Sequence, residues 1–213
     1  MKITWHGQSC FKIVTKDTTI ITDPFSKDIG LKPPHYEANI VTVSHDHADH
    51  NNVSALRGEP FVIKGAGEYE LRDIVILGIN SFHDQKEGKE RGSNTIYVIE
   101  AEDNMRICHL GDLGQKELTD EQIDAIGDID ILMIPVGGVY TIDSEEAANI
   151  INAIEPKIVI PMHYKIPGLN IKLGEIDDFL KEMGASKEVA EQLIVKKKDL
   201  TKEETKVLVM SVS

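Results

Sequence analysis

The stretch Ser44-His45-Asp46-His47-Ala48-Asp49-His50 decides how this chain is organised. Three histidines and two aspartates fall within six consecutive positions, although the whole chain contains only eight histidines. The run before it, residues 40–43, is apolar and β-branched, which favours a buried strand. We therefore expect a buried strand to end here and to deliver a cluster of side chains of the metal-ligand type into a loop.

The spacing within this motif suits metal ions. His45 and His47 are two positions apart, so in extended chain their side chains point to the same side. A turn at Ala48 would bring Asp49 and His50 back towards the same point. Neutral imidazole and carboxylate are the ligands of zinc and of iron or manganese, and four such groups suit two ions that share one pocket. The alternative is a solvated polar loop that happens to be rich in histidine.

Length and charge limit the classes of protein that fit. The 213 residues suit one domain, which we expect over residues 1–213 as two pseudo-repeat halves, roughly 1–105 and 106–213. The net charge is -13, with 36 acidic against 23 basic residues. Non-specific nucleic-acid binding is therefore disfavoured, because phosphate contacts need Lys and Arg. A small-molecule substrate fits better, and a homo-oligomer is left open.

Cysteine usage and apolar runs predict a location in the reducing cytoplasm. The two cysteines, Cys10 and Cys108, are too few for a disulfide framework and read as buried free thiols. Residues 1–6 do not resemble a signal peptide, because no apolar core segment follows the first charge. The longest apolar run, residues 131–140, contains a proline and two glycines and is far too short for a membrane span.

The chain reads as strands first and as alternating helix and strand afterwards. Short β-branched runs between turn residues predict strands at 2–5, 10–15, 18–22, 60–63, 68–71, 74–79, 95–100 and 105–109. From about residue 115 the pattern predicts helices at 119–126, 143–155, 175–183 and 187–193, and strands at 130–136, 157–161 and 206–210. Residues 85–93, charged and glycine-bearing, predict a mobile surface loop. Two mixed sheets packed face to face with helices outside would use all of these elements.

Further residues of the metal-ligand type fall where predicted strands end. His83 follows one strand, Asp112 follows the strand that ends at His109, and His163 follows the strand at 157–161. Catalytic groups of layered folds collect at such an edge. A lone histidine at a strand end is more often structural, but together with the first cluster these residues indicate one shared site.

At this point the sequence resembles the metallo-β-lactamase superfamily along essentially the whole chain. The HxHxDH signature of that family reads in full as His45, His47, Asp49 and His50. The supporting segments are WHGQSCF (5–11), TDP (22–24), GDLG (111–114), PVGGVYT (135–141) and PMHY (161–164). The chain looks closest to a branch of small cytoplasmic hydrolases that includes the L-ascorbate-6-phosphate lactonase. The resemblance implies an α+β fold, the αββα four-layer sandwich of two mixed sheets with helices outside.

The resemblance also implies a set of metal ligands. His45, His47 and His83 would hold one divalent ion; Asp49, His50 and His163 would hold a second; and Asp112 would bridge both. Asp23 would lie outside the ligand set and orient the ligand loop by hydrogen bonds. His109 rivals His83, which we prefer because the first site needs a ligand from another strand. Zinc is the expected metal, with manganese or iron as the alternatives.

A mechanism follows from such a site. Two cations about 3.5 to 4 Å apart would hold a hydroxide between them, because metal binding lowers the pKa of water to roughly 7. The hydroxide would attack a carbonyl carbon or a phosphorus, with Asp49 and Asp112 as the catalytic carboxylates. We expect a hydrolase for a small ester, lactone or amide, with a phosphorylated substrate as one option. The alternatives are a phosphodiesterase or nuclease, and a non-hydrolytic iron or metal-binding protein of the same fold.

Residues near the predicted ligands are candidates for substrate binding. Tyr140 and Thr141 follow a buried strand and a glycine pair, so they could line the pocket and bind or protonate the substrate. Tyr164 and Lys165 come directly after the last predicted ligand and could bind an anionic group. Arg91, in the glycine-bearing loop, is a further candidate for that role.

Overall fold

The first five strands form one mixed sheet. In the computed structural model, which describes residues 1–200 and 204–213, they are β1 (Lys2–Trp5), β2 (Phe11–Val14), β3 (Thr19–Thr22), β4 (Ile40–Val43) and β5 (Phe61–Lys64). Strands β1, β2 and β3 pair antiparallel, whereas β3, β4 and β5 pair parallel. The short strand β13 (Leu193–Ile194) pairs with β1, so the order is β13-β1-β2-β3-β4-β5.

The second sheet is also mixed. Its strands are β6 (Gly67–Leu71), β7 (Ile74–Phe82), β8 (Ser93–Ala101), β9 (Met105–His109), β10 (Ile131–Pro135), β11 (Ile158–Met162) and β14 (Lys206–Val207). The order is β14-β11-β10-β9-β8-β7-β6, antiparallel from β6 to β9 and parallel from β9 to β14. A separate pair joins β12 (Val189–Ala190) to β15 (Val209–Met210).

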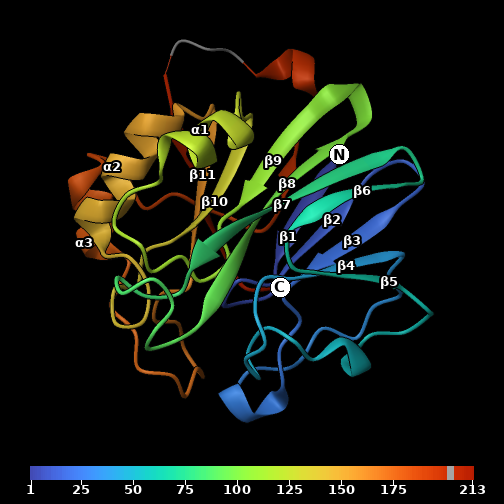
Figure 1. Ribbon diagram of the computed structural model, residues 1–213, viewed down its shortest axis with the longest axis horizontal. Helices are drawn as coiled ribbons and strands as arrows, with labels where there is room; N and C mark the ends of the chain where they lie inside the picture. Colours follow the sequence, from blue (N-terminus) through green and yellow to red (C-terminus); the bar gives the residue numbers. More distant parts are fainter. Residues whose placement is uncertain (201–203) are drawn as a thin grey trace.

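Three helices pack beside the part of the second sheet that contains β10 and β11 (Figure 1). They are α1 (Asp120–Ile126), α2 (Ser144–Ile154) and α3 (Asp177–Glu182). A capping box with Thr119 as N-cap begins α1, and another with Asp143 as N-cap begins α2. The apolar face of α2, residues 147, 150, 151 and 154, is buried in the core.

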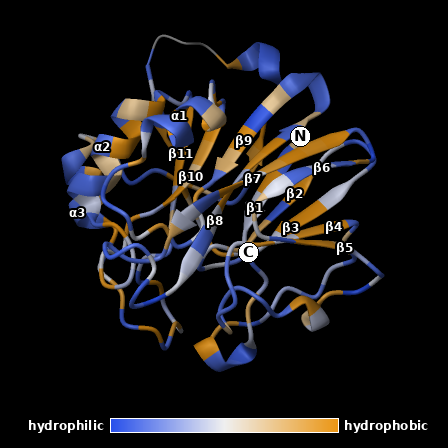
Figure 2. Cartoon of the chain, viewed as in Figure 1, coloured by the Kyte–Doolittle hydropathy of each residue, from blue (hydrophilic) through white to orange (hydrophobic). Residues whose placement is uncertain are grey.

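The strands alternate their side chains between two apolar layers. Ile20 and Ile40 belong to the main core, whereas Ile21 and Val41, one position on, belong to a second cluster. Figure 2 shows these strands as mostly hydrophobic and the helices as mixed. The predicted sandwich is confirmed. The outer layer that covers the first sheet, however, contains loops and two short 3-10 helices in place of long helices. They are η1 (Lys27–Ile29) and η2 (Val53–Ala55), and the prolines of this stretch disfavour a longer helix.

The carboxyl-terminal part differs most from the sequence-based prediction. The helix predicted at 187–193 is wrong, because β12 and the start of β13 lie there and pair with β15 and β1. Open strand edges offer backbone partners that override a weak helical propensity. The predicted strand at 206–210 divides into β14 and β15, which belong to different sheets. The chain passes from the first sheet to the second between β5 and β6. The expectations of a single domain and of two pseudo-repeat halves that meet near residue 105 stay predictions.

Two smaller expectations concern thiols and membranes. Cys10 and Cys108 are buried and free, as the sequence predicts. No helix among the described residues has both the length and the apolar character needed to cross a bilayer.

Asp130, just before β10, is a buried carboxylate that supports the fold. It is 2% exposed and accepts hydrogen bonds from Lys157 Nζ at 2.6 Å, Lys197 Nζ at 2.6 Å and the Arg106 N–H at 2.9 Å. Burial opposes its charge, but these donors, the Lys157 ammonium first, outweigh burial and lower the pKa of Asp130. Its contribution to stability is therefore present above its unfolded pKa of about 3.9 and is lost as the pH falls through the lower, folded pKa.

We expect Asp130→Asn to lower the free energy of unfolding at pH 7 by roughly 1.5–3 kcal/mol, because it removes charge-assisted hydrogen bonds. The difference between variant and wild type should shrink as the pH falls below about 4. Urea unfolding at pH 7 and at several lower pH values measures both effects. An unchanged difference across that range would contradict the assigned cause.

Candidate metal centre

Strand ends bring the predicted site residues to one edge of the sandwich. Asp23 comes directly after β3 and His83 directly after β7, whereas one residue, Ser44, separates His45 from the end of β4. Asp112 comes three residues after β9, and His163 follows β11 directly. Each of these strands ends at this edge, which is where parallel strands of layered folds deliver functional side chains.

The side chains form two adjoining groups. His45, His47 and His83 make one group, and Asp49, His50, Asp112 and His163 make the other; within each, the ligand-type atoms lie within 4.8 Å of one another. The rings of His45 and His50, one from each group, have centroids 4.2 Å apart. The two groups therefore share one space.

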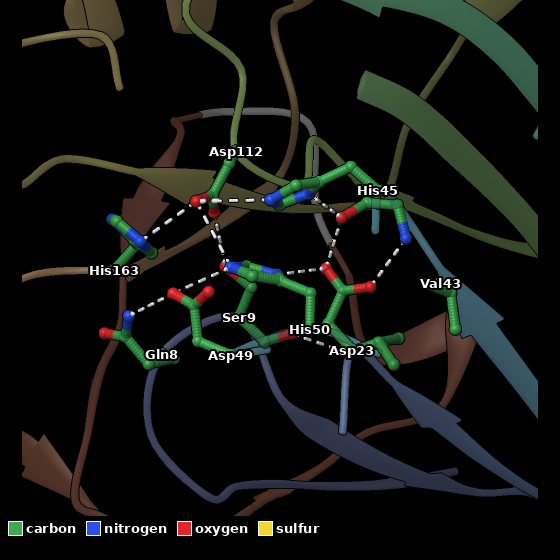
Figure 3. A network of polar contacts seen from close by, with 12 residues as sticks. Gln8, Ser9, Asp23, Val43, His45, Asp49, His50, Asp112 and His163 are labelled. Carbon is green, nitrogen blue, oxygen red and sulfur yellow. Dashed lines mark hydrogen bonds and ion pairs between the residues drawn. The ribbon is translucent and has the colours of Figure 1, made fainter. Parts of the chain in front are cut away.

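Asp112 lies between the two groups (Figure 3). Its Oδ2 is 3.1 Å from His163 Nε2 and 3.2 Å from His50 Nε2 in its own group. The same oxygen is 3.5 Å from His83 Nε2 and 4.0 Å from His45 Nε2 in the other group. One carboxylate oxygen thus faces histidines of both groups.

Buried ring nitrogens without partners test whether these residues suit metal ions. Four such nitrogens occur in the site: His45 Nε2, His50 Nε2, His83 Nδ1 and His163 Nδ1. A buried nitrogen that lacks a hydrogen-bond partner costs about 1–3 kcal/mol. The nitrogens of His45 and His50 face Asp112 Oδ2, where a cation would satisfy imidazole and carboxylate together. The donor set therefore fits divalent metal.

Electrostatics keep His45 and His83 neutral. Burial, and then the neighbouring His50, lower the pKa of His45 to about 3. Burial likewise lowers the pKa of His83 to about 4. The pKa of Asp112 stays well below its ordinary value, because His163 and His50 outweigh the effect of burial. Neutral imidazole and ionised carboxylate are the forms that bind metal.

Asp23 connects one histidine from each group. It is fully buried, and its Oδ2 accepts from His50 Nδ1 at 3.0 Å and from Ser44 Oγ at 2.6 Å (Figure 3). Because the Ser44 hydroxyl gives its proton to Asp23, it accepts from His45 Nδ1 at 3.0 Å. The Ser44 N–H also donates to Asp23 Oδ1 at 2.7 Å. These bonds direct the Nε2 atoms of His45 and His50 inward and set their tautomers.

Three more polar residues hold the aspartates in place. Ser9 Oγ donates to Asp112 Oδ1 at 3.1 Å, and the Asp112 N–H donates to Asn94 Oδ1 at 3.0 Å. Gln8 Nε2 donates to Asp49 Oδ2 at 3.2 Å. The sequence analysis did not single out Ser9, Ser44 or Asn94; the available signal for Ser9 and Ser44 was their place inside the motifs at 5–11 and 44–50.

The backbone is strained at several of these positions. Gln8, Asp23 and His163 have φ of 48°, 40° and 52°, in the left-handed region that non-glycine residues rarely adopt. Gly111 has φ of 57°, and a Cβ there would lie 2.4 Å from Asn94 Oδ1. Such strain costs of order 1–3 kcal/mol at each residue and clusters at functional sites.

Three residues that the sequence suggested as a ligand or as substrate-binding groups lie outside the two groups and the cavity: His109, Tyr164 and Thr141. His109 Nε2 contacts Ser9 O at 2.8 Å and its Nδ1 accepts from the Gly111 N–H at 3.2 Å, so both ring nitrogens are engaged outside the two groups. Tyr164 is buried against the Trp5 ring, and Thr141 is buried with its hydroxyl on a neighbouring carbonyl. These residues are absent from the described lining of the cavity at the site.

The two groups open into a cavity of about 410 Å³. Its lining comprises His47, Asp49, His83, Arg91, Asp112, Tyr140, His163, Asn170, Ile171 and Lys172. This volume suits a small molecule. A larger cavity, about 820 Å³, surrounds Asp130 near the amino-terminal ends of β10 and β11. We place the chemistry in the smaller cavity, because Asp130 is fully paired whereas the site histidines have unpartnered nitrogens.

Comparisons with known proteins agree with this fold. A family model described as a beta-lactamase superfamily domain matches residues 2–163. A UPF0173 metal-dependent hydrolase of Thermoplasma acidophilum is 30% identical over 191 residues, covering 77% of this chain and 83% of that protein. Another, of Methanosphaera stadtmanae, is 31% identical over 205 residues, covering 79% of this chain and 86% of that protein.

A solved structure is also similar over nearly the whole length. It is described as a candidate zinc-dependent hydrolase of the metallo-beta-lactamase superfamily from Thermotoga maritima. It superposes with a TM-score of 0.80 at 37% sequence identity, covering 99% of this chain and 98% of that one.

Proposed function

This chain belongs to the metallo-β-lactamase superfamily, and from that premise we propose that its clustered histidines and aspartates hold two divalent ions and hydrolyse a small ester, lactone or amide. The chain is a metal-dependent hydrolase, the activity for which its curated relatives are named. The number of ions, their identity and the class of substrate are our proposal.

The position of Asp112 carries the proposal of two ions. Its Oδ2 faces histidines of both groups, as expected of a carboxylate that bridges two cations. In this assignment His45, His47 and His83 would hold one ion; Asp49, His50 and His163 would hold the other; and Asp112 would serve both. The nitrogen-rich donor set favours zinc, with manganese or iron as the alternatives.

The chain's own residues prepare the site for hydrolysis. When bound, divalent ions supply a nucleophilic water at neutral pH and polarise the bond to be cleaved. Ser9 fixes Asp112 Oδ1, which leaves Oδ2 directed at the histidines. Gln8 restrains Asp49, and Asp23 holds His50. Because these supports are formed before substrate arrives, the site needs little rearrangement during the reaction.

Size and charge favour a small substrate over nucleic acid. The cavity of about 410 Å³ suits a small molecule, and the chain carries a net charge of -13. The phosphodiesterase alternative therefore has less support. The cytoplasmic location, a homo-oligomer and the narrower likeness to the lactonase branch stay predictions.

Metal loading tests the two-ion site directly. We expect metal-free protein loaded with zinc to bind about two ions per chain, the stoichiometry of a bridged site. At a thousandfold excess over Kd, each bound ion should stabilise the fold by about 4 kcal/mol, which corresponds to a rise in Tm of roughly 10 °C per ion. Elemental analysis and calorimetry measure the two effects.

Single histidine variants sharpen this test. His83→Ala and His163→Ala should each lower the stoichiometry to about one ion, since each removes a ligand of a different ion. His35→Ala is the matched control, because His35 is exposed, contacts the Ala55 carbonyl, and belongs to neither ligand group nor to the cavity lining. Only about one ion, or fewer, per loaded wild-type chain would refute the two-ion assignment.

A further inference from the structure

The charged side chains that line the site cavity are of two kinds: candidate metal ligands, and cations that belong to neither ligand group. Its acidic residues, Asp49 and Asp112, are both candidate metal ligands. Apart from the histidines, its remaining charged residues, Arg91 and Lys172, are both cationic. Arg91 and Lys172 thus balance the two aspartates of the lining, in a chain that carries 36 acidic and 23 basic residues overall. The cavity entrance therefore differs in charge from the chain as a whole.

Arg91 lies against an aromatic ring and not against a carboxylate. Its guanidinium carbon is 4.6 Å from the centroid of the Tyr140 ring, within the range of a cation–π contact. Its loop neighbours Lys86 and Lys89 each pair with a glutamate, whereas Arg91 has no ion pair in the described ranges 1–200 and 204–213. Its charge is thus available to a molecule in the cavity.

Asp84 organises the loop that carries Arg91. Its carboxylate accepts four backbone N–H groups: Lys86 at 2.7 Å, Gly88 at 3.0 Å, Glu90 at 2.9 Å and Arg91 at 2.7 Å. The loop predicted as mobile is therefore folded around one side chain. An ordered loop reduces the entropy lost when Arg91 binds a ligand.

Lys172 lines the same cavity from a different segment of the chain. Its segment is anchored by the Asn170 N–H, which donates to the Ile29 carbonyl at 2.8 Å. Lys172, too, has no ion pair within the part of the chain that the structure describes. The sequence analysis proposed Lys165 for anion binding, but Lys165 is exposed and pairs with Glu175 at 2.7 Å.

We propose that Arg91 and Lys172 form an anion-binding subsite that selects substrates with a carboxylate or phosphate group separate from the bond that is cleaved. The inference rests on the proposed hydrolytic function and names the substrate class for that site. Guanidinium and ammonium groups bind such oxyanions by charge-assisted hydrogen bonds. The subsite would hold the anionic end of the substrate while the scissile group lies at Asp112.

Two matched esters test the proposal. The monoanionic p-nitrophenyl hemisuccinate carries a distal carboxylate, and p-nitrophenyl butyrate is its neutral counterpart. We expect Arg91→Ala and Lys172→Ala each to lower the ratio of kcat/KM for the anionic over the neutral ester by roughly tenfold, mainly through KM. Lys89→Ala, an exposed lysine of the same loop outside the cavity lining, should leave that ratio unchanged.

Binding to the metal-free protein gives a readout independent of turnover. Titration calorimetry with inorganic phosphate and with succinate should show roughly tenfold weaker binding to Arg91→Ala than to wild type, and the tighter anion identifies the preferred group. If both esters are hydrolysed but neither ratio nor affinity changes in the variants, the subsite is refuted and the hydrolase proposal stands. If neither ester is hydrolysed while anion binding depends on Arg91, the subsite stands and the proposed ester hydrolysis is refuted.

Discussion

Asp112→Ala is expected to lower kcat/KM for hydrolysis by roughly 10³-fold or more, because it removes the carboxylate proposed to serve both ions. Asp112 is 2% exposed, and its Oδ2 lies 3.1–3.5 Å from His163, His50 and His83. No other described carboxylate lies within 4.0 Å of histidines from both groups. Metal content should fall together with activity.

The measurement combines elemental analysis with a hydrolysis screen over lactone, thioester, phosphodiester and β-lactam substrates. Asp46→Ala is the matched control: Asp46 belongs to the same motif but is exposed and accepts a hydrogen bond from Asn51 at 2.7 Å. Circular dichroism establishes that both variants fold. Full metal content and activity in Asp112→Ala would overturn the bridging role. Turnover of the phosphodiester alone would favour the phosphodiesterase alternative.

Asp23→Ala is expected to cause the largest loss of stability among single substitutions at the site. It would leave the Ser44 N–H, the Ser44 hydroxyl and the His50 Nδ1–H without their buried acceptor. Removing one member of a buried, charged network costs about 3–5 kcal/mol, which corresponds to roughly 10 °C in Tm for a chain of this size. Calorimetry of metal-free protein measures the loss.

Asp23→Asn separates stability from metal affinity. Asparagine tolerates the left-handed backbone of this residue and keeps one acceptor oxygen, so the stability loss should be smaller. Zinc affinity should still fall roughly 10- to 100-fold, because the histidines lose their orienting charge. Asp17→Ala, in an exposed turn, is the control. Unchanged zinc affinity in both Asp23 variants would show that Asp23 supports only the fold.

Much of the fold could be predicted because its strands are strongly patterned. The runs at 2–5 and 105–109 coincide with β1 and β9, and the helix predicted at 143–155 is α2, which begins at the capping box of Asp143. The helix predicted at 187–193 was wrong because β12 and β13 exist only through pairing with distant strands. Two-residue strands carry too little local pattern to be distinguished from a short helix.

The candidate site, too, contains residues that the sequence predicted and residues that it did not. The cluster at residues 45–50 is local, so its spacing predicted a metal site there. The positions of His83, Asp112 and His163 after predicted strands indicated that they share this site, and the resemblance then implied their roles as ligands. The structure brings these residues together, and their roles as ligands stay a proposal. Ser9, Ser44 and Asn94 could not be identified in advance, because serine and asparagine are common and their hydrogen bonds to Asp112 or Asp23 depend on tertiary contacts.

The ligand-type cluster, the sandwich of two mixed sheets and the likeness to the family could all be predicted from the sequence, because dense histidines and alternating strands are encoded over short stretches. Which cations line the cavity depends on tertiary contacts and could not be predicted. Lys165 is two residues after His163 in the chain but pairs with Glu175, whereas Arg91 and Lys172, which line the cavity, are 81 residues apart. The physical reason is that a cavity entrance forms where separate loops meet, and the Asp84 carboxylate and the Ile29 carbonyl hold these two loops in place.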